Sequence, residues 1–186
     1  MEDIPRDIIE QAQTGDRKAF ESIYRAASGF VYNVALGITN NQEEAKEVTQ
    51  DVFLKIYRHL KNFAFRSSFK TWAYRITVNS SLDAYKRMKR ETSRRLDFET
   101  VIETEAAPVD TAKEVIQKEE RALNQARLEV LLNKLSLEHR TCIVLREIQG
   151  LSYQEISRAL NINLNTVRSR LKRAREALLA YSGGGR

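Results

Sequence analysis

Hydrophobic residues recur every three or four positions along most of the chain, which is the spacing of one side of an α-helix. The segment 16–37 fits one or two such helices, and a further helix is predicted from a cap near Asn41 to about Leu60. The core side of that helix is expected to comprise Ala45, Val48, Val52, Phe53, Ile56, Tyr57 and Leu60. Proline, which breaks helices, occurs only at Pro5 and Pro108. The pattern therefore predicts an all-α protein.

Two short helices joined by a polar turn are predicted near the C-terminus. Ser152 and Glu155 can form a capping box, in which each side chain bonds the other residue's backbone amide, so a helix is expected to start at about Tyr153. This helix runs to about Leu160, and a second helix is expected to follow with Asn165 as its cap. The result is the outline of a helix-turn-helix motif, although any hairpin of two helices can show the same outline.

The second of these helices has one apolar side and one basic side. Its expected buried stripe is Val167, Leu171, Ala174 and Leu178. The candidate contacts to duplex DNA are Asn165, Thr166, Arg168, Ser169, Arg170, Lys172, Arg173 and Arg175. Ser169, Lys172 and Arg173 on the outer face are expected to contact base edges, and the arginines on both shoulders to hold phosphates. A surface helix that arginine merely keeps soluble is the alternative, but it does not explain why residues 166–175 hold five bases and no acid.

The helix that ends near Leu60 carries a candidate surface for a protein partner. Opposite its core side, Leu54 is expected to project from a polar surface. One exposed leucine is ordinary on a soluble protein, whereas a leucine ringed by polar side chains also suits a docking site. The residues of this candidate site are Glu47, Gln50, Asp51, Leu54, Lys55 and Arg58.

Aromatic and basic residues alternate in the segment that follows, 61–75. Aromatic rings between cations are typical of surfaces for single-stranded nucleic acid, because the rings stack on unpaired bases while the cations hold the backbone. Phe69, Trp72 and Ile76 have helical spacing and are mostly expected to pack in the core. The candidate contacts to unpaired DNA are Phe63, Phe65, Arg66, Ser67, Ser68, Lys70, Trp72 and Arg75. In the expected loop, Phe63, Phe65, Ser67 and Ser68 are best placed to meet an extruded base, whereas Arg66, Lys70, Arg75 and the basic run 86–90 are expected to hold phosphates.

The charge is distributed in blocks that separate two domains. The net charge is +6, but residues 55–90 carry ten bases and one acid, residues 91–120 carry four bases and nine acids, and residues 150–181 carry six bases and two acids. Residues 92–112 also contain small residues, a proline and no sustained apolar period, which is typical of a linker. The expected architecture is two small helical domains joined by a flexible acidic linker.

Several classes of protein are not expected from this composition. A single cysteine, Cys142, cannot form an intramolecular disulfide and lies on an apolar stripe, so it is expected to be buried. His59 and His139 have no metal-ligand or triad partners nearby in the sequence. No catalytic residue, metal site or cofactor is therefore expected. No run of about 20 apolar residues is present, so the protein is expected to be soluble and cytoplasmic, without membrane insertion.

Four blocks of sequence together resemble bacterial RNA polymerase sigma factors of the extracytoplasmic-function (ECF) type. These blocks are GDRKAFESIY at 15–24, EVTQDVFLKIYRHL at 47–60, FKTWAYRITVNSSLD at 69–83 and LREIQGLSYQEISRALNINLNTVRSRLKRAREAL at 145–178. The resemblance implies a non-enzymatic, all-α protein that works with the polymerase core. It implies sigma region two at 1–91, a linker at 92–127, sigma region four at 128–182 and a flexible tail at 183–186.

The resemblance also implies roles for the candidate surfaces. The face around Leu54 matches the family's polymerase-binding helix, which docks on a coiled coil of the largest catalytic subunit. The segment 61–79 matches the region that reads and melts the minus-10 element, with Asn79 helping to read a flipped base. The helix from Asn165 matches the reader of the minus-35 element, and the linker resembles the one that threads toward the polymerase active-site channel. The family also suggests an anti-sigma partner between the two domains.

The sequence departs from the family's pattern in one loop, and it also allows one alternative function. The family's loop commonly reads Phe-Arg-Gly-x-Ser, whereas this chain has no glycine in 63–67, so the path of that loop is open. A free-standing helix-turn-helix regulator acting as a homodimer would explain the C-terminal domain equally well. It would not explain the exposed face around Leu54 or the aromatic and basic segment.

Overall fold

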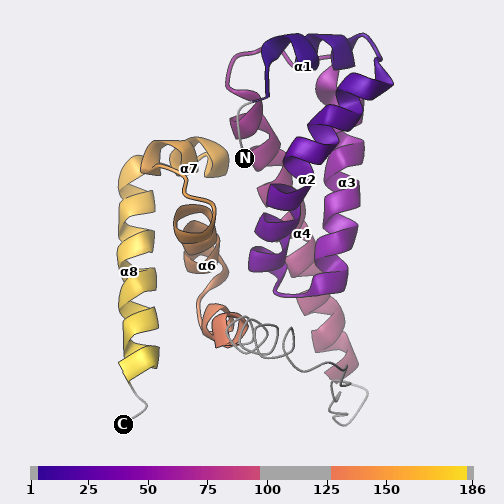
Figure 1. The fold of residues 1–186 in the computed structure, drawn as a ribbon. Helices are drawn as coiled ribbons and strands as arrows, with labels where there is room; N and C mark the ends of the chain where they lie inside the picture. The colour runs from indigo at the N-terminus through magenta and orange to yellow at the C-terminus, as the bar shows by residue number, and fades with distance from the viewer. Residues whose placement is uncertain (1–3, 97–126, 184–186) are drawn as a thin grey trace, which may run out of the picture.

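The computed structural model describes residues 4–96 and 127–183, and every regular element in these ranges is helical. The N-terminal half contains α1 (Arg6–Gln13), α2 (Arg17–Thr39), α3 (Gln42–Leu60) and α4 (Phe69–Leu96). The C-terminal half contains a helical segment at 127–133, α6 (Leu137–Ile143), the π-helix η1 (Val144–Ile148), α7 (Tyr153–Leu160) and α8 (Leu164–Gly183). The predicted all-α class is confirmed, and Figure 1 shows the two groups of helices.

Local capping sets the ends of the N-terminal helices. The Asp16 carboxylate accepts hydrogen bonds from the amides of Lys18 and Ala19 and so starts α2, which runs as one helix to Thr39. The amide of Glu44 donates to the Asn41 side chain at 3.0 Å, so the predicted cap of α3 is confirmed. The helices α2, α3 and α4 pack against one another around a shared apolar core.

The core side of α3 agrees with the predicted stripe except at Tyr57. The other six residues of the stripe are buried, whereas Tyr57 is 60% exposed. At about 100° per residue, Tyr57 lies roughly 100° from the centre of the stripe, beyond Phe53. Its ring instead packs edge-on against Phe20 at the rim of the core, with ring centroids 5.1 Å apart. The prediction that Tyr57 belongs to the core is therefore wrong.

The C-terminal helices form the predicted helix-turn-helix. The capping box of α7 is present, because the Ser152 amide donates to Glu155 Oε2 at 2.8 Å and the Glu155 amide donates to Ser152 Oγ at 3.2 Å. The turn ends α7 with Asn161 in the left-handed region. Val167, Leu171 and Ala174 of α8 are buried, and Leu178 packs partly buried at the edge of the core. The Ser136 side chain caps α6 by accepting a hydrogen bond from the His139 amide.

The start of α8 differs from the prediction by two residues. The helix begins at Leu164, and the Asn163 side chain accepts a hydrogen bond from the Asn165 amide at 2.8 Å. The Asn163 carbonyl also accepts from the Val167 amide, which closes the first turn. The predicted cap at Asn165 is therefore wrong, because Asn163 already satisfies the free amide at the helix end.

This assignment of the cap is testable by unfolding. Replacing Asn163 with alanine removes the capping acceptor, so we expect a loss of about 1 kcal/mol in the free energy of unfolding of the C-terminal domain. Replacing Asn165 with alanine, at an exposed position inside the first turn, is the matched control and is expected to change the free energy by less than about 0.5 kcal/mol. Urea unfolding followed by circular dichroism measures both. An equal loss in the two variants would contradict the assignment.

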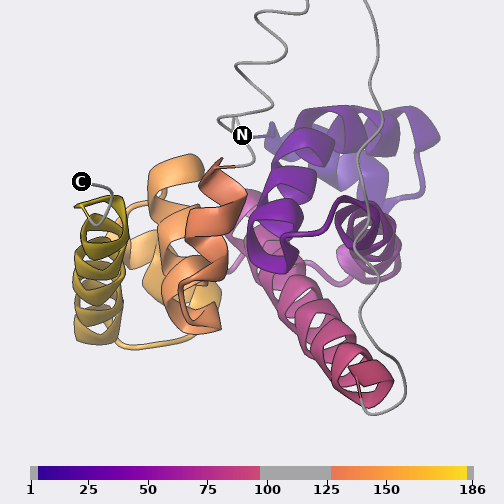
Figure 2. The same cartoon turned by 90° about the horizontal axis from the view of Figure 1, so that it is seen from below.

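The two groups of helices lie directly against each other. The helix α4 contacts α7, and α2 contacts both α6 and η1. Figures 1 and 2, seen from perpendicular directions, both show the C-terminal helices alongside α2 and α4. The helix α4 continues to Leu96, five residues beyond the expected end of the first domain at 91. Residues 97–126, which hold most of the predicted linker, and residues 184–186 of the predicted tail lie outside the described residues.

Candidate nucleic-acid and protein interfaces

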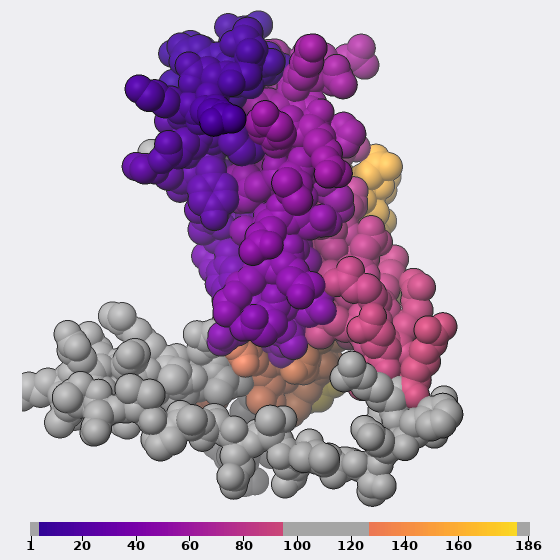
Figure 3. Space-filling model, turned by 90° about the vertical axis from the view of Figure 1, so that its right-hand side faces the viewer, coloured from indigo at the N-terminus to yellow at the C-terminus, as the bar shows by residue number. Residues whose placement is uncertain are grey.

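The outer face of α3 presents Leu54 to solvent, as the sequence predicts. Leu54 is 52% exposed, and the other residues of the candidate docking site are exposed as well, except for the half-buried Lys55. In Figure 3 this helix, in violet, crosses the side of the molecule that faces away from α6, α7 and α8. The face around Leu54 is therefore accessible while the two domains are packed together.

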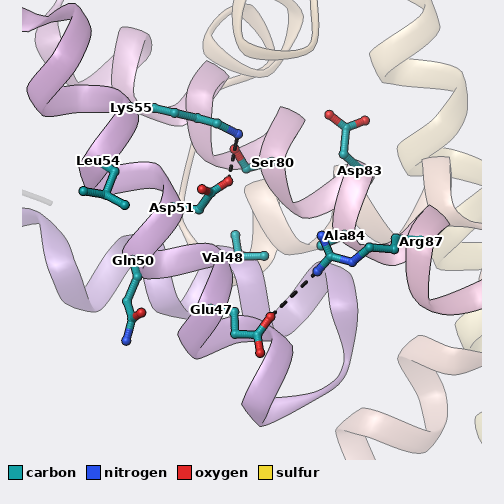
Figure 4. Close-up of a pocket in the computed structure, with 10 residues that line it drawn as sticks. All are labelled: Glu47, Val48, Gln50, Asp51, Leu54, Lys55, Ser80, Asp83, Ala84 and Arg87. Carbon is teal, nitrogen blue, oxygen red and sulfur yellow. Dashed lines mark hydrogen bonds and ion pairs between the residues drawn. The ribbon is translucent and has the colours of Figure 1, made fainter.

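A groove of about 410 Å³ runs beside Leu54, between α3 and α4 (Figure 4). Lys55 Nζ lies 3.0 Å from Asp51 Oδ2 and donates to Ser80 Oγ on α4 at 2.9 Å. On the other side of the groove, Arg87 of α4 lies 3.0 Å from Glu44 Oε2 and 3.8 Å from Glu47 Oε2. These contacts fix the polar rim, whereas Figure 4 shows Leu54 and Gln50 pointing away from α4. A fixed polar rim around an exposed apolar side chain suits a protein partner.

The aromatic segment is largely a packed cluster. Phe63 is only 7% exposed, and its ring centroid lies 4.9 Å from those of both Phe65 and Trp72 and 6.0 Å from that of Phe69. The Gln13 side chain of α1 donates to the carbonyls of Leu60 and Phe63 and so holds the loop onto the domain. The expectation that the Phe63 ring is available in an open loop is therefore wrong. Packing three neighbouring rings against Phe63 removes more apolar surface from water than an open loop with an exposed ring would.

Phe65 takes the conformation that the absent glycine would normally supply. Its φ is 54°, in the left-handed region that favours glycine. The ring packs against that of Phe63, with ring centroids 4.9 Å apart and the planes tilted by 55°, and the Arg6 guanidinium lies 4.5 Å from the Phe65 ring centroid. In the absence of the glycine, Phe65 therefore takes the strained position in the turn, where the Phe63 ring and the Arg6 guanidinium both contact its ring.

One face of α4 gathers most of the remaining candidates for unpaired DNA. At 100° per residue, the half-exposed Trp72 and the exposed Arg75 and Asn79 fall within about 60° of one another. Within the basic run 86–90, only Lys86 and Arg90, both exposed, continue the same face. Projecting the full length of α4 onto a helical wheel is enough to place Lys86 and Arg90 on the same face as Trp72, Arg75 and Asn79. Arg66, Ser67 and Ser68 lie in the turn before α4, where Ser68 Oγ accepts from the Thr71 amide at 3.2 Å.

Lys70 lies apart from that face. It points toward α7, with Nζ 3.9 Å from Glu155 Oε1, and its side chain is only 27% exposed. The structure therefore does not bring Lys70 together with Arg75 and Asn79, because a separation of five residues turns Lys70 to the other side of α4 relative to Arg75.

The outer face of α8 carries the candidates for duplex DNA. Asn165, Arg168, Ser169, Lys172, Arg173 and Arg175 are exposed, and Thr166 and Arg170 are half-buried. Arg175 is held by Glu147, with Nη2 2.7 Å from Oε1, and by the Tyr153 hydroxyl, and this ion pair raises the pKa of Arg175. Ser169 and its neighbours Lys172 and Arg173 share one face of the helix, which is the geometry that a major-groove reader needs.

The single cysteine is buried, as predicted. Cys142 is a free thiol in the apolar core of the C-terminal domain, and burial raises its pKa to about 11. A thiol with this pKa is almost entirely protonated near pH 7 and is a poor nucleophile. Among the described residues, no group of three or more His, Cys, Asp or Glu side chains is placed to hold a metal ion. In those same ranges, no helix is both long enough and apolar enough to cross a membrane.

Comparison with known proteins identifies both domains. Residues 23–91 match the family profile of sigma-70 region 2, and residues 125–178 match that of sigma-70 region 4. The RNA polymerase sigma-H factor of Pseudomonas aeruginosa is 33% identical, over 93% of this chain and 91% of its own length. The ECF RNA polymerase sigma factor SigW of Bacillus subtilis is 30% identical, over 96% of each chain. The fold is also that of CnrH, solved in complex with the cytosolic domain of CnrY, with a TM-score of 0.73 and 24% identity over 97% of this chain and 98% of CnrH. The chain therefore belongs to the ECF family of RNA polymerase sigma factors.

Proposed function

We propose that this protein divides promoter recognition among three separate surfaces. The outer face of α3 binds the polymerase core, the face of α4 with Trp72, Arg75 and Asn79 captures unpaired bases of the minus-10 element, and the outer face of α8 reads the minus-35 duplex. The observation that carries the proposal is that these three exposed surfaces lie on different helices, each with the side chains that its ligand requires.

Recognition of the upstream element is assigned to α8. Ser169, Lys172 and Arg173 supply short and long donors at the centre of the outer face, where a major groove presents base edges. Arg168, Arg170 and Arg175 at the shoulders, with Asn165 and Thr166 at the first turn, are assigned to phosphates, which position the helix without reading the sequence.

Capture of unpaired bases is assigned to α4 and the turn before it. Extruding a base costs a few kcal/mol, which stacking on an aromatic ring and hydrogen bonds in a pocket offset only in the melted state. Trp72 supplies a partly exposed ring, Asn79 an amide that can bond a base edge, and Arg66 and Arg75 charges for the backbone. Phe63, which is buried, supports this surface from beneath by packing on Trp72.

The polymerase core supplies the spacing between the two DNA-binding surfaces. When one surface is bound, the second binds at a high effective concentration, so two weak contacts together become one strong contact. The protein thus contributes recognition in the cytoplasm, without catalysing a reaction itself. A protein partner that inhibits the sigma factor is also proposed, because the solved CnrH chain of the same fold is held by the cytosolic domain of another protein.

A reconstitution experiment tests the proposal. The purified chain is mixed with core polymerase, co-purification is measured, and run-off transcription is assayed on promoters selected in vitro. We expect a stable complex and transcripts that require both the chain and the core. A chain that binds palindromic duplexes as a homodimer, and neither binds core nor starts transcripts, would instead support the free-standing regulator.

A further inference from the structure

One acidic residue lies within the basic segment that ends in α4. Residues 55–90 hold ten bases, and Asp83 is their single acid. At about 100° per residue, Asp83 lies about 40° around α4 from Asn79 and about 20° from both Trp72 and Arg90. Asp83 is exposed. An acceptor of negative charge therefore occupies the face of α4 that is proposed to capture unpaired bases.

The Asp83 carboxylate has no cation bound to it. Asp and Arg four residues apart on a helix commonly form an ion pair, which predicts a contact between Asp83 and Arg87. Arg87 instead lies 3.0 Å from Glu44 Oε2 and 3.8 Å from Glu47 Oε2 on α3. Figure 4 shows the Asp83 carboxylate pointing away from Arg87. Within 4–96 and 127–183 no ion pair or hydrogen bond engages the Asp83 side chain, so both of its oxygens are free to accept from a ligand.

A carboxylate at this position opposes the phosphates that the neighbouring cations attract. Arg75 precedes Asp83 by about two turns and Lys86 follows it by about one, so cations lie on both sides of it along α4. These cations suit the DNA backbone, whereas two anions repel each other. Contact with DNA is favourable for Asp83 only where the DNA donates hydrogen bonds, and in an unpaired strand the donors are on the base edges.

The unpaired bases differ in how well they fit a carboxylate, which accepts hydrogen bonds and cannot donate them. The Watson–Crick edge of guanine has an N–H and an amino group side by side, so guanine can donate two parallel hydrogen bonds to one carboxylate, as an arginine side chain does. Cytosine and adenine present one amino group beside a ring nitrogen that repels the carboxylate. The ring N–H of thymine lies between two carbonyl oxygens. Guanine is therefore the base that suits Asp83 best.

We propose that Asp83 is a specificity-determining residue that binds the Watson–Crick edge of one unpaired guanine, close to the base held at Asn79. The separation of Asn79 and Asp83 along α4 is about 6 Å, and stacked nucleotides of one strand are spaced by about 3.4 Å, so this guanine lies within about two nucleotides of that base. The inference rests on the proposed function, because it requires the unpaired strand to lie along α4. The charge of Asp83 lowers affinity for every backbone and thereby rejects strands that lack the guanine.

A selection from randomised DNA locates the guanine. Holoenzyme is reconstituted from core polymerase and the full chain and mixed with duplexes that contain an unpaired, randomised minus-10 strand, and the bound strands are sequenced. The original holoenzyme is expected to enrich guanine at one position at which Asp83→Ala lowers the enrichment by about fivefold or more, the smaller effect of one bidentate base contact. The same base preferences at every position in both proteins would overturn the proposal.

A base analogue tests the contact itself. Inosine is guanine without its amino group, so it removes one of the two donors. At the selected position, inosine in place of guanine is expected to weaken binding of the original holoenzyme by about fivefold or more, and to change binding of the Asp83→Ala holoenzyme by no more than about twofold. This coupling between residue and base separates the contact from a general effect of charge. Equal losses in the two proteins would contradict the contact.

Glu91 provides a matched control on the same helix. It is exposed and lies about two turns beyond Asp83, turned by about 80° around α4. Asp83→Asn and Glu91→Gln each remove one negative charge, so both are expected to strengthen binding to single-stranded DNA of any sequence at low salt. Only Asp83→Asn is expected to change which base is preferred. A similar change of preference in Glu91→Gln would assign the effect to net charge and not to Asp83.

Binding to core polymerase without DNA excludes the main alternative for Asp83. The residue also borders the groove beside Leu54, so a contact with polymerase would appear as weaker core binding by Asp83→Ala, and that result would overturn a role in reading a base. If the original holoenzyme enriches no base in the unpaired strand, the proposed function of α4 fails and the inference fails with it. If bases are enriched but none depends on Asp83, the inference alone fails.

Discussion

Replacing Leu54 with aspartate is expected to weaken binding of core RNA polymerase by at least about 30-fold, or about 2 kcal/mol. Leu54 is the one large apolar side chain at the centre of the polar α3 face, and the groove beside it is already rimmed by fixed ion pairs. A carboxylate at this position would be desolvated without a partner, next to Asp51 and Glu47. Binding of the full chain to immobilised core polymerase measures the loss.

The control for this prediction is Leu54→Met at the same position. Methionine keeps the volume and apolar character of the side chain, so binding is expected to change by no more than a few fold. Because Leu54 is 52% exposed, neither substitution is expected to alter thermal unfolding of the free chain by more than a few degrees. If the aspartate variant bound core as well as the original chain does, the outer face of α3 would not be the polymerase site.

Replacing Arg173 with alanine is expected to weaken recognition of the upstream element by about 1–3 kcal/mol, with little effect on unrelated duplexes. Arg173 lies exposed on the outer face of α8 beside Ser169 and Lys172, where a guanidinium can bond two acceptors on one base. The measurement is binding of the holoenzyme to duplexes carrying either a selected upstream element or a scrambled one. An equal loss on both duplexes would make Arg173 a phosphate contact.

Arg168→Ala is the matched control on the same helix. Arg168 is also exposed, but it lies on the shoulder of α8 and donates to the Asn165 side chain at 3.1 Å. A phosphate contact at this position predicts a similar loss on every sequence and a slope of log affinity against log salt that is shallower by about one. A sequence-specific loss in this variant would instead assign Arg168 to base recognition and reverse the expected division of roles.

The two domains differ in how far their surfaces could be predicted from sequence. The helix-turn-helix is a local motif, since its capping box, its turn at Asn161 and its basic outer face all lie within about 30 residues. Periodicity alone therefore places Ser169, Lys172 and Arg173 on one exposed face. The region of α4 and its preceding loop depends on contacts from α1, such as the hydrogen bonds of Gln13 to Leu60 and Phe63, which no local pattern contains.

The misplaced residues lie where a local pattern leaves more than one choice. The burial of Phe63 depends on the rings that pack on it from α4, whereas Tyr57 lies at the edge of the α3 stripe and remains exposed beside Phe20. Two asparagines within three residues could each have capped α8, and only the backbone path of the turn selects Asn163. In each case the sequence specifies a set of chemically suitable residues, and tertiary packing chooses among them.

The amino-acid sequence by itself determined the all-α class, the core stripe of α3 apart from Tyr57, the helix-turn-helix and the exposed position of Leu54, because these follow from helical periodicity and capping over a few turns. Only the tertiary structure decided the burial of Phe63, the separation of Lys70 from the face of Arg75 and Asn79, and the contact between the two domains at Gly37, Val144 and Arg140. Gly37 and Val144 are 107 positions apart in the sequence, and Arg140 donates to the Ile38 carbonyl of α2 from 102 positions away. A local pattern of hydrophobic and polar residues contains neither contact, because each joins residues that are distant in the sequence.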